Sequence, residues 1–150
     1  MSVTSEKPAV PSERFGLLIG DTARMWRAKL NQRLKPLGLS QAQWFALLHL
    51  SRAGRDLTQT ELAEKIGIEG PTLVRLLDRM ARDKWIIRRE SEQDRRSNTV
   101  HLTAQALAII KDIQAAASQL RKELLKGIPA SDLQHCIAVL ERINATALTI

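Results

Sequence analysis

The chain has 150 residues, 44% of them apolar, which fits one domain with enough apolar side chains for a core. Its 23 Lys and Arg exceed its 16 Asp and Glu, so the formal net charge is +7. This excess favours a polyanionic partner, and charge alone leaves nucleic acid and an anionic membrane surface both open.

Membrane insertion and secretion have little support in the sequence. No run reaches the roughly 18 to 20 apolar residues of a membrane span, and the N-terminal residues lack the layout of a signal peptide. Cys136 is the only cysteine, which excludes an intrachain disulfide and a zinc site of clustered cysteines. We expect a cytoplasmic protein that does not bind membranes.

Residues 1–12 carry Pro8 and Pro11 and few large apolar side chains, so we expect a flexible N-terminal leader. Residues 13–38 follow as one long amphipathic helix, ended by Pro36 and Gly38. Its apolar residues recur at steps of three and four: Phe15, Leu18, Ile19, Met25, Trp26, Leu30, Leu34 and Leu37.

Two capping boxes predict the next two helices. Ser40 and Gln43 open a helix that runs to about Ala53, and Thr58 and Glu61 open a short helix that ends at Gly67. In each box the hydroxyl accepts a hydrogen bond from a free backbone N–H, and the residue three positions later reaches back.

The following helix begins at Pro71, a favoured first-turn residue, and runs to about Asp83. We place Leu73, Val74, Leu77, Met80 and Ala81 on its inward face. Thr72, Arg75, Leu76 and Arg79 then share the outward face. Two short helices joined by the glycine-containing turn IGIEGP are typical of a helix-turn-helix, whose second helix fits the major groove.

Two β-prone runs follow, WIIRRE and NTVHL, separated by the charged segment SEQDRRS. A hairpin directly after a helix-turn-helix is a wing, and its tip would project toward the same duplex. Thr103 then caps a long helix that is closed by Gly127 and Pro129, and a last helix completes the chain.

The terminal helices carry more apolar surface than a small winged domain needs, which suggests a two-fold dimer interface. The expected dimerisation residues are Phe15, Leu18, Leu120, Leu124, Leu133, Ile137, Leu140 and Ile143. The predicted fold class is mainly α with a small β wing. We divide it into a leader (1–12), an N-terminal dimerisation helix (13–38), a winged helix-turn-helix (39–103) and C-terminal dimerisation helices (104–150).

The basic residues between Arg75 and His101 suggest how DNA would be bound: this stretch holds eight basic and five acidic residues. Arg75 and Arg79 could reach guanine or phosphate, and Thr72 and Leu76 could touch thymine methyl groups. The plain alternative is a solvated helix face. At the tip, Asp94 could orient Arg96, beside Arg95, for a narrow minor groove, or the two could form only a surface ion pair in a turn.

The run IGIEGPTLVRLLDRMARDKWIIRRESEQDRRSNTVHLT, with its D-x-R at 94–96 and closing L-T, resembles the MarR family of winged-helix transcription regulators. The stretch ARMWRAKLNQRLKPLGLSQAQW is similar to the SlyA branch. The resemblance covers about residues 13–148. It implies a homodimer on a pseudo-palindromic operator, dimerised through the first and last two helices. It places Pro71, Thr72, Val74 and Arg75 at the major groove and Arg96, steadied by Asp94, in the minor groove.

The resemblance also implies a small aromatic acid as effector, bound between the dimer helices and the winged domain. Arg24 and Trp26 on the first helix, with Trp44 and His49 on the second, could offer a cation and flat apolar walls to such a carboxylate. The alternative is that Trp26 and Trp44 simply pack in the core. We expect Cys136 to be packed and inert, and oxidant sensing is disfavoured.

An enzyme has little support, because no metal-ligand spacing, glycine-rich phosphate loop or nucleophile elbow is visible. We therefore expect a protein without catalytic residues, metal or cofactor. Two functions remain open: a sequence-specific, ligand-tunable DNA-binding dimer, and a helical scaffold or interaction dimer with only weak non-specific association with nucleic acid.

Overall fold

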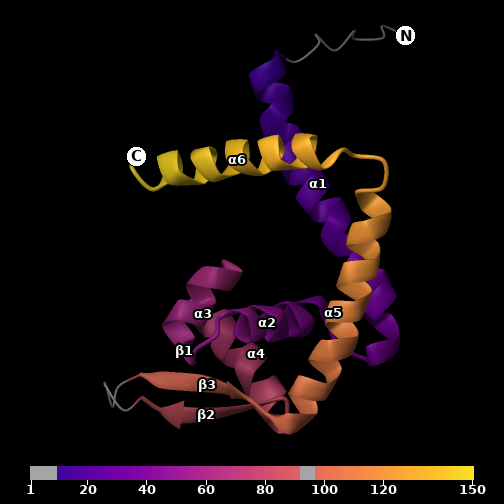
Figure 1. Ribbon diagram of the computed structural model, residues 1–150. Coiled ribbons are helices and arrows are strands. Elements are labelled where there is room, and N and C mark those ends of the chain that lie inside the picture. Colours follow the sequence, from indigo (N-terminus) through magenta and orange to yellow (C-terminus); the bar gives the residue numbers. More distant parts are fainter. Residues whose placement is uncertain (1–9, 92–96) are drawn as a thin grey trace, which may run out of the picture. The chain divides into compact units, whose positions relative to one another are not determined.

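The computed structural model describes residues 10–91 and 97–150, and it is mainly helical with one small antiparallel sheet (Figure 1). This confirms the predicted fold class. The elements, in chain order, are α1 (Pro11–Leu34), the 3-10 helix η1 (Lys35–Leu37), α2 (Gln41–Arg52), β1 (Leu57–Thr58), α3 (Gln59–Ile66), α4 (Gly70–Arg82), β2 (Ile86–Glu90), β3 (Asn98–Leu102), α5 (Ala104–Leu124) and α6 (Ala130–Ala147). The chain divides into two compact units, residues 1–117 and 118–150.

Both predicted capping boxes are present. Gln43 N donates to Ser40 Oγ over 3.3 Å, and Ser40 N donates to Gln43 Oε1 over 3.0 Å. Thr58 and Glu61 make the same exchange at the start of α3. Each box satisfies two groups that a helix start leaves without partners. The sequence placed Pro11 in the leader, whereas it is the first residue of α1, because its missing N–H is not needed there.

The three strands pair antiparallel in the order β1–β3–β2. The predicted hairpin is therefore correct: Ile86 pairs with Leu102 and Glu90 with Asn98. The sequence did not predict β1, whose Leu57 pairs with Val100. A two-residue strand is too short to be recognised by an alternating pattern. Because β1 directly precedes α3, its pairing with β3 connects the hairpin to the helices.

The core of the first unit lies where α1, α2, α3, α4, the sheet and the first half of α5 meet. Its largest fully buried side chains are Trp44, Leu34, Leu47, Leu57, Leu62, Leu73, Leu76, Leu77, Met80 and Ile113. Every α-helix of the unit and β1 contribute to this list, and Ile86 of β2 and Val100 of β3 are also buried, so α4 and the sheet share one apolar interior.

A tight corner joins α4 to β2. Lys84 has a φ of 64°, the left-handed region that non-glycine residues seldom adopt, and this reverses the chain within a few residues. Thr103 stabilises the same corner, since its hydroxyl donates to the carbonyl of Lys84 over 2.7 Å. The hydroxyl also accepts from Ala106 N at 3.2 Å, so Thr103 caps α5, as predicted.

The second unit contains the end of α5 and all of α6. Every residue of α6 is described, and none of them is buried within the chain. Its apolar side chains, Ile137, Val139, Leu140 and Ile143 among them, are instead exposed. A helix with an apolar face and no cover of its own is typical of an element that packs against another surface.

Candidate nucleic-acid interface

Helix α4 has one buried face and one basic exposed face. Leu73, Leu76, Leu77 and Met80 are buried, at the i, i+3, i+4, i+7 spacing of a helix that packs along one side. Pro71, Thr72, Arg75 and Arg79 are all exposed. The exposed residues start at the first turn, which in a helix-turn-helix is the part that enters the groove.

Two residues of α4 lie on the opposite face from the one that the helical wheel gave. Leu76 is only 2% exposed, and Val74 is 39% exposed. The error arose because two overlapping stripes, one with Val74 and one with Leu76, both satisfy the helical period around Leu73, Leu77 and Met80. The core selects Leu76, so Leu76 cannot touch a base, and Val74 is the exposed apolar residue.

The wing is described up to the ends of its two strands. Ser91 N donates to Ser97 O over 2.8 Å and so continues the hairpin ladder past β2. Asp94, Arg95 and Arg96, the predicted minor-groove residues, lie outside the described residues. The base of the wing carries further basic side chains, of which Arg89 is exposed and Arg88 is partly exposed.

Arg88 joins the wing to α4. Its Nη1 lies 2.7 Å from Oδ1 of Asp78, so the pair forms a salt bridge between β2 and the exposed side of α4. This pair was not predicted from the sequence. A signal was present, because Asp78 and Arg88 are of opposite charge on two elements that must meet at a tight corner, but only the fold shows which partner each charge takes.

His101 forms a second link at the other edge of the hairpin. Its Nδ1 lies 3.2 Å from Oδ1 of Asp56, in the loop before β1, and its Nε2 lies 2.7 Å from the hydroxyl oxygen of Thr99. Both ring nitrogens are thus engaged. The contacts tie β3 to the loop before β1 in addition to the short ladder with β1.

A groove of about 610 Å³ separates α3 from the first half of α4, bordered by Gln59, Thr60, Gly70 and Val74 among others. Gln59 Oε1 is buried there without a hydrogen-bond partner. The groove runs between the two helices of the helix-turn-helix, next to the exposed start of α4. Sequence reasoning did not single out Gln59, because a glutamine in a first turn carries no distinctive pattern.

The predicted effector residues do not form one site. Trp44 is fully buried, and its Nε1 donates to Asn31 Oδ1 over 3.0 Å, so the packing alternative holds and Trp44 offers no wall to a ligand. Arg24 is exposed and pairs with Asp21, three residues before it on α1. Trp26 is partly exposed on α1.

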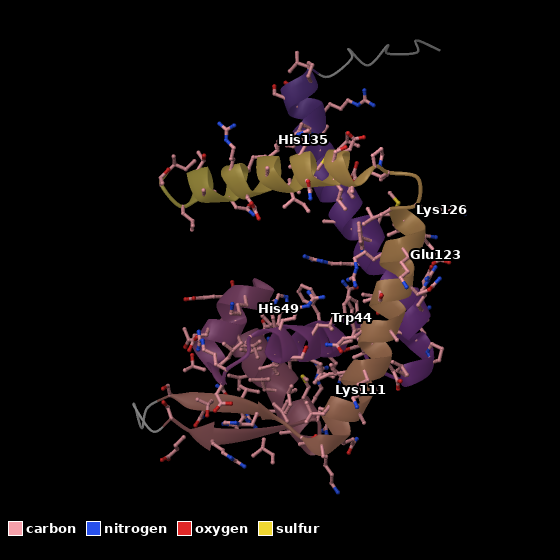
Figure 2. All side chains as sticks on the ribbon, viewed as in Figure 1. Trp44, His49, Lys111, Glu123, Lys126 and His135 are labelled. Atoms are coloured by element: carbon pink, nitrogen blue, oxygen red, sulfur yellow. The ribbon has the colours of Figure 1, made fainter. Side chains whose placement is uncertain are left out.

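His49 lies in a cluster of α1 and α2 side chains around Phe45, whose ring also contacts that of Trp44 edge to face, with centroids 5.8 Å apart. The ring of His49 contacts that of Phe45 edge to face, with centroids 4.5 Å apart, and the guanidinium of Arg27 lies 4.8 Å from the centroid of Phe45. Figure 2 shows Trp44 and His49 on the same helix, α2. Burial is the main cause that lowers the pKa of His49 below its ordinary value of 6.5, and the nearby charges of Arg52, Lys65 and Arg27 lower it further.

The predicted dimerisation residues differ in exposure. Phe15, Leu18, Leu124, Ile137, Leu140 and Ile143 are exposed, and Leu133 is half-buried. Leu120 is only 2% exposed, so the chain itself already covers it and it is not part of the exposed apolar surface. Cys136 was expected to be packed, whereas it is exposed on α6, because no residue of that helix is buried.

Residues 10–91 and 97–150 contain neither a membrane-spanning helix nor a metal-binding cluster. No helix there combines the length and the apolar character that crossing a bilayer requires. The same residues contain no group of three or more His, Cys, Asp or Glu side chains that could hold a metal ion.

Known proteins match both the sequence and the fold. A family model described as "MarR family" matches residues 37–97. The solved structure of transcriptional regulator PA3341 is 45% identical with a TM-score of 0.86, and the match covers 91% of this chain and 99% of that one. Apo wild-type MarR from E. coli is 27% identical with a TM-score of 0.74, covering 91% and 98%.

A third match is a mutant MarR from E. coli that was crystallised in complex with operator DNA. It is 27% identical with a TM-score of 0.75, and the match covers 87% of this chain and 93% of that one. The fold and the exposed recognition helix define a winged-helix transcription regulator. The chain belongs to the MarR family.

Proposed function

We propose that this chain is a sequence-specific DNA-binding regulator that acts as a homodimer on a pseudo-palindromic operator. The observation that carries the proposal is the division of α4, which buries four apolar side chains and exposes Pro71, Thr72, Arg75 and Arg79 from its first turn onward. A helix with one face packed on the core and an exposed face that carries Arg75 and Arg79 is the arrangement that major-groove binding needs. The MarR relative in complex with operator DNA supports the same reading.

Arg75 is the strongest candidate for base recognition. Its guanidinium can donate two parallel hydrogen bonds to guanine O6 and N7, whereas Arg79, one turn further from the start of α4, is better suited to a phosphate. Val74 takes the role that the sequence analysis gave to Leu76, because an exposed isopropyl group can contact a thymine methyl group. Thr72 completes this surface.

For the wing we keep the prediction that Arg96, oriented by Asp94 and next to Arg95, enters the minor groove. A narrow minor groove has a strong negative potential that attracts arginine, and a carboxylate beside the guanidinium can orient it in advance. The support here is the hairpin itself, since β2 and β3 end at Glu90 and Asn98 and the D-x-R segment lies between them.

Dimerisation is proposed for the terminal helices. The exposed apolar residues of α1, such as Phe15 and Leu18, and those of α6, such as Leu140 and Ile143, offer more apolar surface than a soluble monomer normally leaves uncovered. A second copy of the chain is the simplest cover, because a two-fold axis buries the same patch twice. The two recognition helices would then reach half-sites roughly 34–36 Å apart.

We propose a small aromatic acid as effector, at a site different from the one first predicted. The guanidinium of Arg27 lies over the ring of Phe45, and Arg52 and Lys65 add positive charge near His49, whose ring packs against Phe45. Cations and a flat apolar ring together suit an aryl carboxylate. We also keep the SlyA branch, on the sequence of the first two helices, and a cytoplasmic location, where DNA is the partner.

The proposal is tested by selecting bound fragments from a random duplex library with the purified chain. A regulator recovers one inverted repeat whose half-sites are about one helical turn apart. Recovery of fragments without a common sequence would instead favour the alternative, a helical scaffold with only non-specific affinity for nucleic acid. Titrating salicylate and benzoate into the complex then tests the effector, which should release DNA or tighten it.

A further inference from the structure

We propose that the Asp78–Arg88 ion pair sets the angle between the recognition helix and the wing, and that both residues therefore act as positioning residues for operator binding. This inference rests on the proposed function. It adds a role for two residues that bind no base themselves. The contact is between Asp78 Oδ1 on α4 and Arg88 Nη1 on β2, 2.7 Å apart.

The wing needs such a link because β2 is the free edge of the sheet. The strand order β1–β3–β2 leaves β2 paired on one side only. Its inward face carries Ile86, which is buried in the core, and two residues later Arg88, which the alternation of a strand directs to the same side. Ile86 fixes the base of the strand, and Arg88 is the next inward residue toward the tip.

The corner before β2 is a tight turn, with Lys84 at a φ of 64°. Thr103 holds this corner through the carbonyl of Lys84. The β1–β3 ladder and the contact between His101 and Asp56 hold the hairpin on its β3 side, whereas the Asp78–Arg88 pair ties β2 directly to α4. Asp78 lies one turn before the end of α4, so its pair with Arg88 links α4 to β2 across the corner.

The geometry matters because DNA has fixed distances between its grooves. Arg75 and the wing tip can bind adjacent grooves together only when the helix and the hairpin hold one angle. A preset angle lowers the ordering cost that binding must otherwise meet. The pair is partly exposed, at 29% for Arg88 and 56% for Asp78, so it contributes little to folding.

For Asp78→Asn, simple electrostatics and the proposed positioning role predict opposite changes in affinity for the operator. Replacing Asp78 with Asn removes a negative charge from a surface that faces a polyanion, so simple electrostatics predicts tighter binding to any duplex. The positioning role predicts weaker binding to the operator only. The sign of the change therefore separates the two.

The experiment measures affinity at fixed salt for the duplex that the parent chain recovers from a random library, and for a shuffled duplex. We expect Asp78→Asn to weaken binding to the recovered duplex about five- to tenfold, with equal or tighter binding to the shuffled one. The charge swap, Asp78→Arg with Arg88→Asp, should restore affinity to within about twofold. Asp21→Asn, which breaks an exposed pair within α1, is the matched control and should leave both affinities near those of the parent.

Hydroxyl-radical footprints give a second readout. In Asp78→Asn the protection in the flanking minor grooves should weaken more than the protection at the centre of each half-site. Equal or tighter binding of Asp78→Asn to the recovered duplex would overturn the inference. A swap that fails to restore affinity, with a salt slope lower by about one, would also overturn it, because Arg88 would then be a phosphate ligand.

The failure of the proposed function has a different signature. A parent chain that recovers no common sequence would remove the proposed function and this inference with it. A recovered sequence that parent and variants bind equally would remove the inference alone.

Discussion

Helix α4 has 13 residues and helix α6 has 18, and both carry an apolar face, but only the apolar face of α4 is buried within the chain. In α4 the residues Leu73, Leu76, Leu77 and Met80 are buried in a core that the winged-helix unit completes by itself. In α6 the comparable residues, Leu140 and Ile143 among them, remain exposed. The core of the first unit is thus covered within one chain, whereas the apolar face of α6 is not.

Leu76 gives the largest expected effect and tests the buried half of this comparison. Replacing Leu76 with Ala should lower the free energy of unfolding by about 2–5 kcal/mol, because it leaves a cavity beside Leu73 and Met80. Val74→Ala, on the exposed face, should cost much less. Chemical denaturation of both variants at one protein concentration measures the two free energies of unfolding. Equal values would contradict the burial of Leu76.

Leu140 tests the exposed half of the comparison. Replacing it with Asp should weaken dimerisation by about 2 kcal/mol or more, since a charge would enter a buried apolar interface. Gln134→Asp adds the same charge on α6 and serves as the control. Analytical ultracentrifugation over a range of concentrations reports the dimer, and circular dichroism should show that the helices persist. An unchanged mass distribution would show that α6 is not in the interface.

Arg75 tests whether the exposed face of α4 reads DNA. Replacing it with Ala should cost about 1–3 kcal/mol of binding to the recovered operator and should relax the base preference at one position in each half-site. Lys111→Ala, on α5, removes one positive charge elsewhere. If the two variants lose the same affinity on every duplex, Arg75 supplies only charge.

His49 gives the smallest effect, through pH. Its pKa in the folded chain is below 6.5, so the unfolded chain binds the proton more readily as pH falls past that value. The stability contributed by His49 is therefore complete above about pH 6.5 and is lost as pH falls toward the folded pKa. We expect the free energy of unfolding to fall more for the parent than for His49→Gln between pH 7 and pH 5, as measured by denaturation of both proteins at each pH. Equal losses in the two proteins would show that His49 is not held neutral.

Much of the fold could be predicted because its signals are local. The capping boxes at Ser40 and Thr58, the first-turn proline at 71 and the cap at Thr103 each depend on side chains a few residues apart. The residues missed or misplaced depend on distant partners. The core decides that Leu76 rather than Val74 is buried, and β1 exists only because Leu57 meets Val100.

The candidate site shows the same division. The exposed basic residues of α4 follow from a helical period and a count of charges, and they are where the sequence placed them. The effector residues were chosen by type, and their contacts differ: Arg24 pairs with Asp21, Trp44 is buried and bonds to Asn31, and His49 packs on Phe45, which also contacts Trp44. Periodicity states which side chains share one helix face, but it cannot state which faces of different helices meet.

Specific DNA binding is the central claim, and a competition measurement at one salt concentration tests it most directly. The recovered operator, labelled with a fluorophore and bound by the chain, is displaced by unlabelled operator or by a shuffled duplex of equal length. The account predicts that the operator competes about a thousandfold better or more, with steep weakening as salt rises. Equal competition by the two duplexes would contradict it.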